Sequence, residues 1–129
     1  MKFSYATQDE WEADWSFEGC APDGSGVLNV LEGYTEGLAE SKWLDGGATP
    51  GHWTNLDMGD CTQPEAADIR WRYALSDCGG SDTPLWSKHR NAVDPVTGRM
   101  HLDLSTAIEE DGGDDTRRYL KLKLSLRRG

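Results

Sequence analysis

The stretch "RYLKLKLSLRR", from Arg118 to Arg128, decides the fold class of this chain of 129 residues. Leucines take every second position within it, and polar or basic residues stand between them. Such alternation is typical of a β-strand with one buried face and one outward face. The buried face is predicted to consist of Leu120, Leu122, Leu124 and Leu126. A basic arm for nucleic acid is the competing interpretation, because six of the thirteen basic residues lie between Arg117 and Arg128. A disordered arm, however, has no need of the alternation.

Further segments carry strand signals and are separated by turns rich in Gly and Pro. The clearest is "DIRWRYALSD", in which one face is predicted to hold Ile69, Trp71, Tyr73 and Leu75. Its other face is predicted to hold Arg70, Arg72, Ala74 and Ser76. The remaining strand segments are residues 27–33, 52–59, 85–91 and 99–106. Because no segment predicts a long helix, we expect an all-β fold, an antiparallel β-sandwich of jelly-roll type.

The length suits a single domain. We expect residues 26–129 to form the sandwich and residues 1–25 to be a short irregular lead-in that packs on it. Within the lead-in, Trp11 and Trp15 are four residues apart, which would align them on one face of a helical turn. The alternative is that these two aromatic residues cap one end of the sandwich.

Two segments are predicted to be loops. Residues 34–51 could form one helical turn, but Gly37 weakens it and a loop is favoured. Residues 109–115, "EEDGGDD", are too polar for anything but a hydrophilic loop.

The charge is uneven along the chain. The net charge is −10, with 12 acidic and 2 basic residues in positions 1–60 and 11 of each in positions 61–129. This acidic excess repels nucleic acid phosphates, so no nucleic acid partner is expected. No apolar run approaches the roughly 18 to 20 residues of a membrane span, and no signal peptide is evident. We therefore expect a soluble protein without membrane insertion.

Motifs of catalysis and metal binding are missing from the sequence. None of the three histidines lies in a known catalytic motif. Cys20, Cys61 and Cys78 are too far apart for the paired ligands of a zinc site and are expected to be reduced thiols. The acidic loops resemble no EF-hand and are expected to be solvated turns. We therefore predict no enzymatic activity, no metal site and no cofactor.

Aromatic and basic residues are the candidates for an interaction surface. Trp71 is in phase with Ile69 and Tyr73 and is predicted to lie in the core, whereas Trp53 is the best candidate for exposure. Lys121 and Lys123 are expected either to shield a sheet edge or to meet acidic residues of a neighbouring copy. The full set of interaction candidates is Trp43, Trp53, Trp86, Lys121, Lys123 and Arg127.

The order of the strand and turn motifs carries a resemblance. Four motifs follow one another along the chain: Asp57 with Gly59, the turn from Ser76 to Gly79, Trp86 with Ser87, and the strand from Arg118 to Leu126. In this order they resemble the galactose-binding-like or jelly-roll β-sandwich domains of tail and other virion proteins of tailed phages. The chain departs from that pattern by having Gly51 and His52 where a Ser-Pro pair precedes the second strand.

The resemblance implies a non-enzymatic structural component of a tailed virus particle, either a tail protein or a capsid accessory protein. Its partners would be other virion proteins and copies of itself, assembled in the host cytoplasm. A carbohydrate-binding or receptor-binding module that recognises cell-surface glycan is the alternative, with Trp53 as its aromatic platform.

Overall fold

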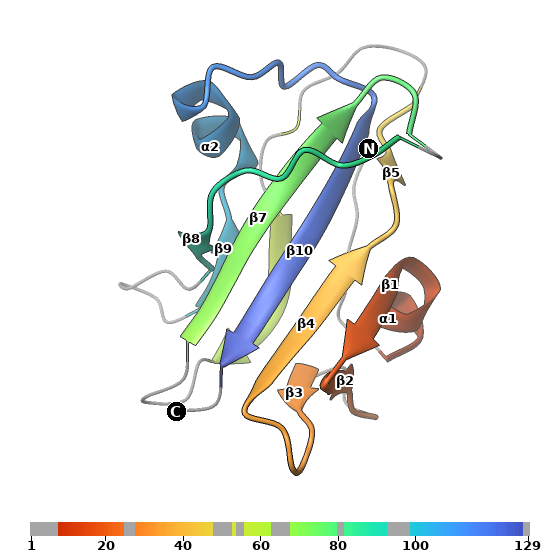
Figure 1. Cartoon of the computed structure of the whole chain (residues 1–129), viewed down its shortest axis with the longest axis vertical. Helices are drawn as coiled ribbons and strands as arrows, with labels where there is room; N and C mark the ends of the chain where they lie inside the picture. The colour runs from red at the N-terminus through yellow and green to blue at the C-terminus, as the bar shows by residue number, and fades with distance from the viewer. Residues whose placement is uncertain are drawn as a thin grey trace.

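The computed structural model describes residues 8–24, 28–47, 53, 56–62, 68–79, 82–92 and 99–127. It confirms the predicted fold class, since antiparallel sheets pack against one another with two short helices beside them (Figure 1). The elements in chain order are α1 (Gln8–Asp14), β1 (Trp15–Glu18), β2 (Cys20–Pro22), β3 (Leu28–Val30), β4 (Glu36–Ser41), β5 (Leu44–Asp45), β6 (Leu56–Thr62), β7 (Asp68–Ser76), β8 (Arg90–Asn91), β9 (Arg99–Leu102), α2 (Leu104–Glu110) and β10 (Tyr119–Arg127). The largest sheet has the order β1-β4-β10-β7-β8, and β5 also pairs with β10.

Strand β10 lies in the interior of the large sheet, between β4 and β7. Its four leucines are at most 5% exposed, which confirms the predicted buried face. Leu122 stands opposite Tyr73 of β7, and Lys123 stands opposite Glu40 of β4 and Arg72 of β7. Because both edges of β10 are paired, the idea that its lysines shield a sheet edge is wrong.

Strand β7 follows the prediction on its inner face, but Ala74 and Ser76 of the predicted outward face are buried as well. Ile69, Trp71 and Tyr73 are buried on the same side as the leucines of β10. The partner strand predicted at residues 85–91 is much shorter than expected, because only Arg90 and Asn91 form a ladder with β7. Before it, the Ser87 N–H donates a single hydrogen bond to the Tyr73 carbonyl at 2.8 Å.

The second layer consists of the β6–β9 pair and helix α2, which lie behind the large sheet in Figure 1. The strand predicted at residues 99–106 ends at Leu102, and a helix begins two residues later. Asp103 caps this helix by accepting a hydrogen bond from the Thr106 N–H at 3.1 Å. Consequently the predicted loop at residues 109–115 begins inside α2. Buried helical side chains then complete the core: Leu104, Ala107 and Ile108.

Strand β4 occupies part of the segment that was predicted to be a loop. Its buried face consists of Gly37, Ala39 and Ser41, which alternate with partly or fully exposed residues. Such small residues give almost no hydrophobic signal, so the period of two was not visible in the sequence. The face is nevertheless integral to the sheet, since the Leu122 N–H donates to Ser41 Oγ at 2.8 Å.

Within the described part of the N-terminal segment, the helix α1 runs from Gln8 to Asp14. Trp15 already belongs to β1, so the chain turns between the two tryptophans instead of continuing the helix. Both are buried, and their ring centroids lie 5.2 Å apart. Since β1 pairs with β4, the lead-in also supplies the edge strand of the large sheet.

The two free thiols in the described chain are those of Cys20 and Cys78. Burial raises the pKa of the Cys20 thiol to about 11, and its Sγ donates to the Leu38 carbonyl. The side chain of Cys61 lies outside the described residues.

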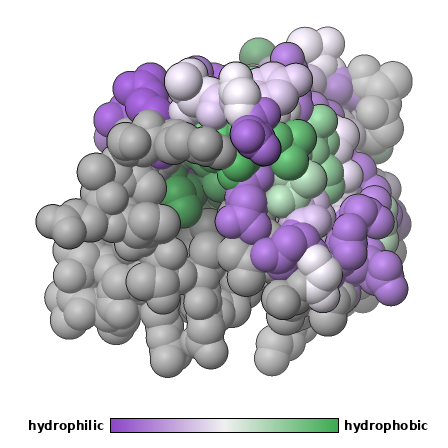
Figure 2. All heavy atoms as spheres, turned by 90° about the horizontal axis from the view of Figure 1, so that it is seen from below, coloured by the Kyte–Doolittle hydropathy of each residue, from purple (hydrophilic) through white to green (hydrophobic). Residues whose placement is uncertain are grey.

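The remaining strand predictions are partly met. The segment 27–33 contains β3, and the strand predicted at 52–59 is shifted to Leu56–Thr62, where β6 makes an irregular ladder with β9. Seen from below, hydrophobic residues form a band bordered by hydrophilic ones, as expected for an apolar layer beneath a polar surface (Figure 2). Neither of the two helices in the described chain has the length and hydropathy needed to cross a bilayer.

Candidate functional site

The outer face of the large sheet is the surface of β4, β10 and β7 that points away from the buried leucines. Four of the six predicted interaction candidates gather there through contacts with one another or with shared neighbours: Trp43, Trp86, Lys121 and Lys123. Arg127 lies on the same face, at the end of β10. Trp53 is the one candidate that lies elsewhere.

Glu40 is at the centre of the outer face. Its carboxylate lies 3.4 Å from Lys121 Nζ and 3.5 Å from Lys123 Nζ. The lysine side chains are 18% and 20% exposed, so these ion pairs are partly shielded from water. The acidic residue that the two lysines meet therefore belongs to their own chain.

The two tryptophans of the outer face are held by cations. Lys121 Nζ lies 5.7 Å from the ring centroid of Trp43, and Lys123 Nζ lies 5.5 Å from that of Trp86. The Arg72 guanidinium lies over the Trp86 ring as well, at 5.4 Å. Each such contact contributes about 0.5 to 1 kcal/mol at a partly exposed site. The aromatic rings are thereby fixed against the sheet instead of projecting into solvent.

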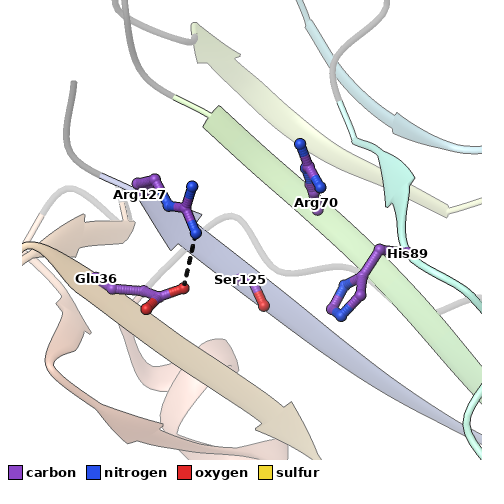
Figure 3. Close-up of a pocket in the computed structure, with 5 residues that line it drawn as sticks. All are labelled: Glu36, Arg70, His89, Ser125 and Arg127. Carbon is purple, nitrogen blue, oxygen red and sulfur yellow. Dashed lines mark ion pairs between the residues drawn. The ribbon is translucent and has the colours of Figure 1, made fainter.

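A small cavity of about 130 Å³ opens at the lower end of this face (Figure 3). Its lining consists of Glu36, Arg70, His89, Ser125 and Arg127. Arg127 Nη2 lies 3.8 Å from Glu36 Oε1. Partial burial lowers the pKa of His89, and the nearby cations Arg72, Arg70 and Lys123 lower it further.

Trp53 does not form the exposed platform that was predicted for it. It is half-buried and packs against the hydrophobic core. Its indole N–H donates to the Arg117 carbonyl at 2.8 Å. A side chain that is used in this way is a poor stacking surface for a sugar ring, so the reason for assigning Trp53 to glycan binding is lost.

The sequence interpretation missed four residues of the outer face: Glu40, Arg70, Arg72 and His89. The alternation in β7 did place both arginines on the other face of the strand from Ile69, so their outward position could have been predicted. Glu40 fell in a predicted loop, and His89 lies in no catalytic motif that would have singled it out.

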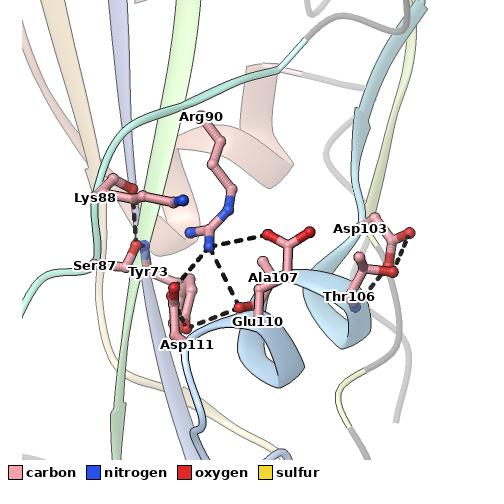
Figure 4. A network of polar contacts seen from close by, with 9 residues as sticks. All are labelled: Tyr73, Ser87, Lys88, Arg90, Asp103, Thr106, Ala107, Glu110 and Asp111. Carbon is pink, nitrogen blue, oxygen red and sulfur yellow. Dashed lines mark hydrogen bonds and ion pairs between the residues drawn. The ribbon is translucent and has the colours of Figure 1, made fainter.

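A second polar cluster lies on the inner side of the sheet, where α2 meets β7 and β8 (Figure 4). Arg90 Nη2 donates to Asp111 Oδ1 at 2.9 Å, and the Tyr73 hydroxyl donates to Asp111 Oδ2. The Arg90 guanidinium also lies over the rings of Trp71 and Tyr73. Hydrogen bonds from Arg90 and Tyr73 lower the pKa of Asp111, and burial followed by the Asp111 contact raises that of Tyr73. These contacts fasten the end of α2 to the sheet.

Replacing Asp111 by Asn is expected to lower the free energy of unfolding by about 2 kcal/mol, because it removes a charge-assisted hydrogen bond from a partly buried Arg90. The folded-state pKa of Asp111 is depressed, so its contribution is present above about pH 4 and is lost as pH falls. Asp45, whose pKa is lowered to about 2 by Arg118, behaves in the same way. Urea denaturation at neutral and acidic pH measures both effects. The loss of stability on acidification should be smaller in Asp111→Asn than in the wild type. Glu109→Gln, on the exposed side of α2, should change neither the stability at neutral pH nor its loss on acidification.

No group of three or more His, Cys, Asp or Glu side chains that could hold a metal ion is found among the described residues. Comparison with known proteins identifies no relative of this chain, so its resemblance to virion domains remains a prediction. The chain matches no family model, no curated protein and no solved structure.

Proposed function

We propose that this protein is a non-enzymatic structural component of a tailed virus particle, and that it assembles head to tail with copies of itself. The order of strand and turn motifs described above is the support for the virus particle. The observation that carries the mode of assembly is the charge of the outer face, which is opposite in sign to that of the whole chain.

The outer face has a surplus of positive charge. Its described basic side chains are Arg70, Arg72, Lys121, Lys123 and Arg127, and its described acidic side chains are Glu36 and Glu40. The chain as a whole carries a net charge of −10. A basic surface on an acidic protein attracts acidic surfaces of other copies, and this attraction also orients them.

The complementary acidic surface is helix α1, which leads into strand β1. Asp9 and Glu12 of the helix are exposed carboxylates. Both elements lie at the edge of the large sheet opposite β8 (Figure 1). Contact between the outer face of one copy and α1 of the next uses two different surfaces. Such heterologous contacts close into rings or continue as filaments, the arrangements expected in a virus tail or on a capsid.

The aromatic residues add contact area to this charge complementarity. Trp43 and Trp86 are half-buried, and cations already fix their rings. A rigid aromatic surface loses little conformational entropy on binding, and Trp and Arg are the residues that most often dominate protein interfaces.

A charge reversal tests the proposal. In the triple variant Lys121→Glu, Lys123→Glu, Glu40→Lys, the ion pairs within the chain keep their geometry with signs exchanged, while the net charge of these three positions changes from +1 to −1. The variant loses two cation–π contacts, about 1 to 2 kcal/mol, which a domain with about 5 to 15 kcal/mol of stability tolerates. We expect it to fold but to stop associating in sedimentation velocity at low salt.

The matched variant is Asp9→Lys with Glu12→Lys, which reverses the charge of α1. It should also be monomeric alone, but a mixture of the two variants should associate again, because each then offers the surface that the other lacks. A wild-type protein that stays monomeric at high concentration and low salt contradicts the mode of assembly. Failure to find the chain by mass spectrometry in particles of a virus that encodes it contradicts the virion role.

A further inference from the structure

From the cavity at the lower end of the outer face we infer a binding site for a single tetrahedral oxyanion, such as a sulfate or phosphate group. Three cationic or hydrogen-bonding nitrogen groups and one hydroxyl line it, and one carboxylate faces them (Figure 3). The inference goes beyond the proposed function and does not depend on self-association.

The sheet register brings these side chains together. Ser125 of β10 stands opposite Arg70 of β7, and Arg127 follows Ser125 by two residues and therefore lies on the same face. Across the other edge of β10, Glu36 of β4 stands opposite Arg127. His89 enters from the segment that runs along β7 just before β8. Four segments distant in the sequence thus supply one cavity.

The size of the cavity selects a small group. Its volume is about 130 Å³. Sites for whole drug-sized ligands measure about 300 to 1,000 Å³. One oxyanion, or one such group on a larger molecule that extends into solvent, fits this space.

The charges favour a dianion. Among the described side chains that line the cavity, the guanidinium groups of Arg70 and Arg127 face the single carboxylate of Glu36, and Arg72 and Lys123 stand next to the cavity. The Arg127–Glu36 pair is long, and its side chains are 67% and 53% exposed, so it holds Arg127 weakly. Arg127 can therefore turn toward an anion at little cost. Guanidinium groups are well suited to oxyanions because they donate parallel hydrogen bonds.

His89 reports on the occupant of the cavity. The charged groups around its imidazole are Arg70 and Arg72 from β7, Lys123 and Arg127 from β10, and Glu36 from β4. Partial burial lowers the pKa of His89, the neighbouring cations Arg72, Arg70 and Lys123 lower it further, and a bound anion should raise it again. Because the anion favours the protonated imidazole, binding should strengthen as pH falls through the pKa of His89.

The experiment is a titration of the full chain with sulfate, followed by NMR signals of the His89 imidazole. Chloride is exchanged for sulfate at constant ionic strength, so that general screening does not change. Sulfate remains a dianion from about pH 5 to pH 8, the range in which histidine titrates, and any pH dependence therefore belongs to the protein. We expect a saturable shift in the millimolar range, a raised His89 pKa, a similar effect of inorganic phosphate and a much weaker effect of acetate.

Substitutions of the basic and of the acidic residues that line the cavity should change the affinity for sulfate in opposite directions. Arg70→Gln and Arg127→Gln should each weaken sulfate binding about ten-fold, the usual loss for a charge-assisted hydrogen bond. Glu36→Gln should strengthen it about two- to five-fold, because it removes the carboxylate that repels the anion. His89→Gln should abolish the dependence of binding on pH.

The control is Arg117→Gln, which removes one positive charge before the start of β10, at the opposite end of that strand from Arg127. It should leave sulfate binding within a factor of about two, the scale of a screened, distant charge. Two outcomes overturn the inference. One is a sulfate response no larger than that of acetate, and the other is an equal loss of binding in Arg117→Gln and Arg127→Gln. Measuring at concentrations where the chain is monomeric separates this result from the test of self-association.

Discussion

Replacing Leu122 by Asp is expected to unfold the protein. Leu122 is completely buried, stands opposite Tyr73 and belongs to the strand that joins both halves of the large sheet. A carboxylate at this position would be surrounded by apolar side chains and would have to lose its hydration or its charge. The expected cost exceeds about 5 kcal/mol, which is comparable to the whole stability of a domain of this size.

Circular dichroism and urea denaturation measure this effect, and a graded series makes it specific. Leu122→Ala should lower the free energy of unfolding by about 2 to 5 kcal/mol, and Leu122→Met by less than about 1.5 kcal/mol. Ser125→Asp introduces the same carboxylate into the same strand on its outer face, beside Arg70 and Arg127, and should leave the protein folded. A Leu122→Asp variant with a cooperative unfolding transition like that of the wild type would contradict the two-layered sheet arrangement.

Replacing Gly37 by Val is expected to lower the free energy of unfolding by about 3 kcal/mol. A Cβ atom at Gly37 would lie 2.5 Å from Cys20 Cβ, 3.1 Å from its Sγ and 3.2 Å from the Gly19 carbonyl oxygen. The first of these atoms is attached to the backbone of β2 and the last belongs to the backbone just before it, so the clash cannot be relieved by a side-chain rotation. Strands β4 and β2 would have to move apart.

Urea denaturation again measures the loss. Leu38→Val, at the neighbouring and half-buried position of β4, should cost less than about 1.5 kcal/mol. Removing the opposing Cβ should relieve the clash, so the double variant Gly37→Ala, Cys20→Gly should lose less stability than the sum of its two single variants. Strict additivity would show that β2 and β4 do not approach as closely as described.

The two strands that were predicted correctly are those whose buried faces consist of large apolar residues. Each of β10 and β7 alternates leucine, isoleucine or aromatic residues with charged ones, so its pattern of period two has high contrast. Strand β4 has the same period of burial, but its inner face consists of glycine, alanine and serine. Small residues are needed there because β2 packs close to the sheet. This proximity is a tertiary contact that no pattern in the local sequence predicts.

Helix α2 was missed for a different reason. Met100, Leu102 and Leu104 alternate as they would in a strand, and the prediction carried the strand past Leu102. The helical signal was present, because Leu104, Ala107 and Ile108 have helical spacing and Asp103 is three residues before Thr106. The period of a strand and the period of a helix overlapped in these few residues. The Asp103 cap marks the point where the helix begins.

For the outer face, the alternation of residues predicted which side chains of β10 point outward but not what they meet. Lys121 and Lys123 were expected either to shield a sheet edge or to meet acidic residues of another copy, and the structure shows Glu40 of the same chain between them. Cross-strand neighbours depend on the order of strands in the sheet. That order depends on long-range pairing, which cannot be predicted from the composition of the individual strands.

The position of β10 also fixes the order of events during synthesis. All of its partners, β4, β5 and β7, precede it in the chain, and β4 and β7 have no direct pairing with each other. A ribosome adds about 5 to 20 residues each second, so β4 leaves the exit tunnel seconds before the strand that will pair with it. During this interval the nascent chain exposes two unpaired strand edges and the apolar faces of β7 and α2, the features that make incomplete chains prone to aggregation. The large sheet closes when β10 inserts, and only then does the outer face exist.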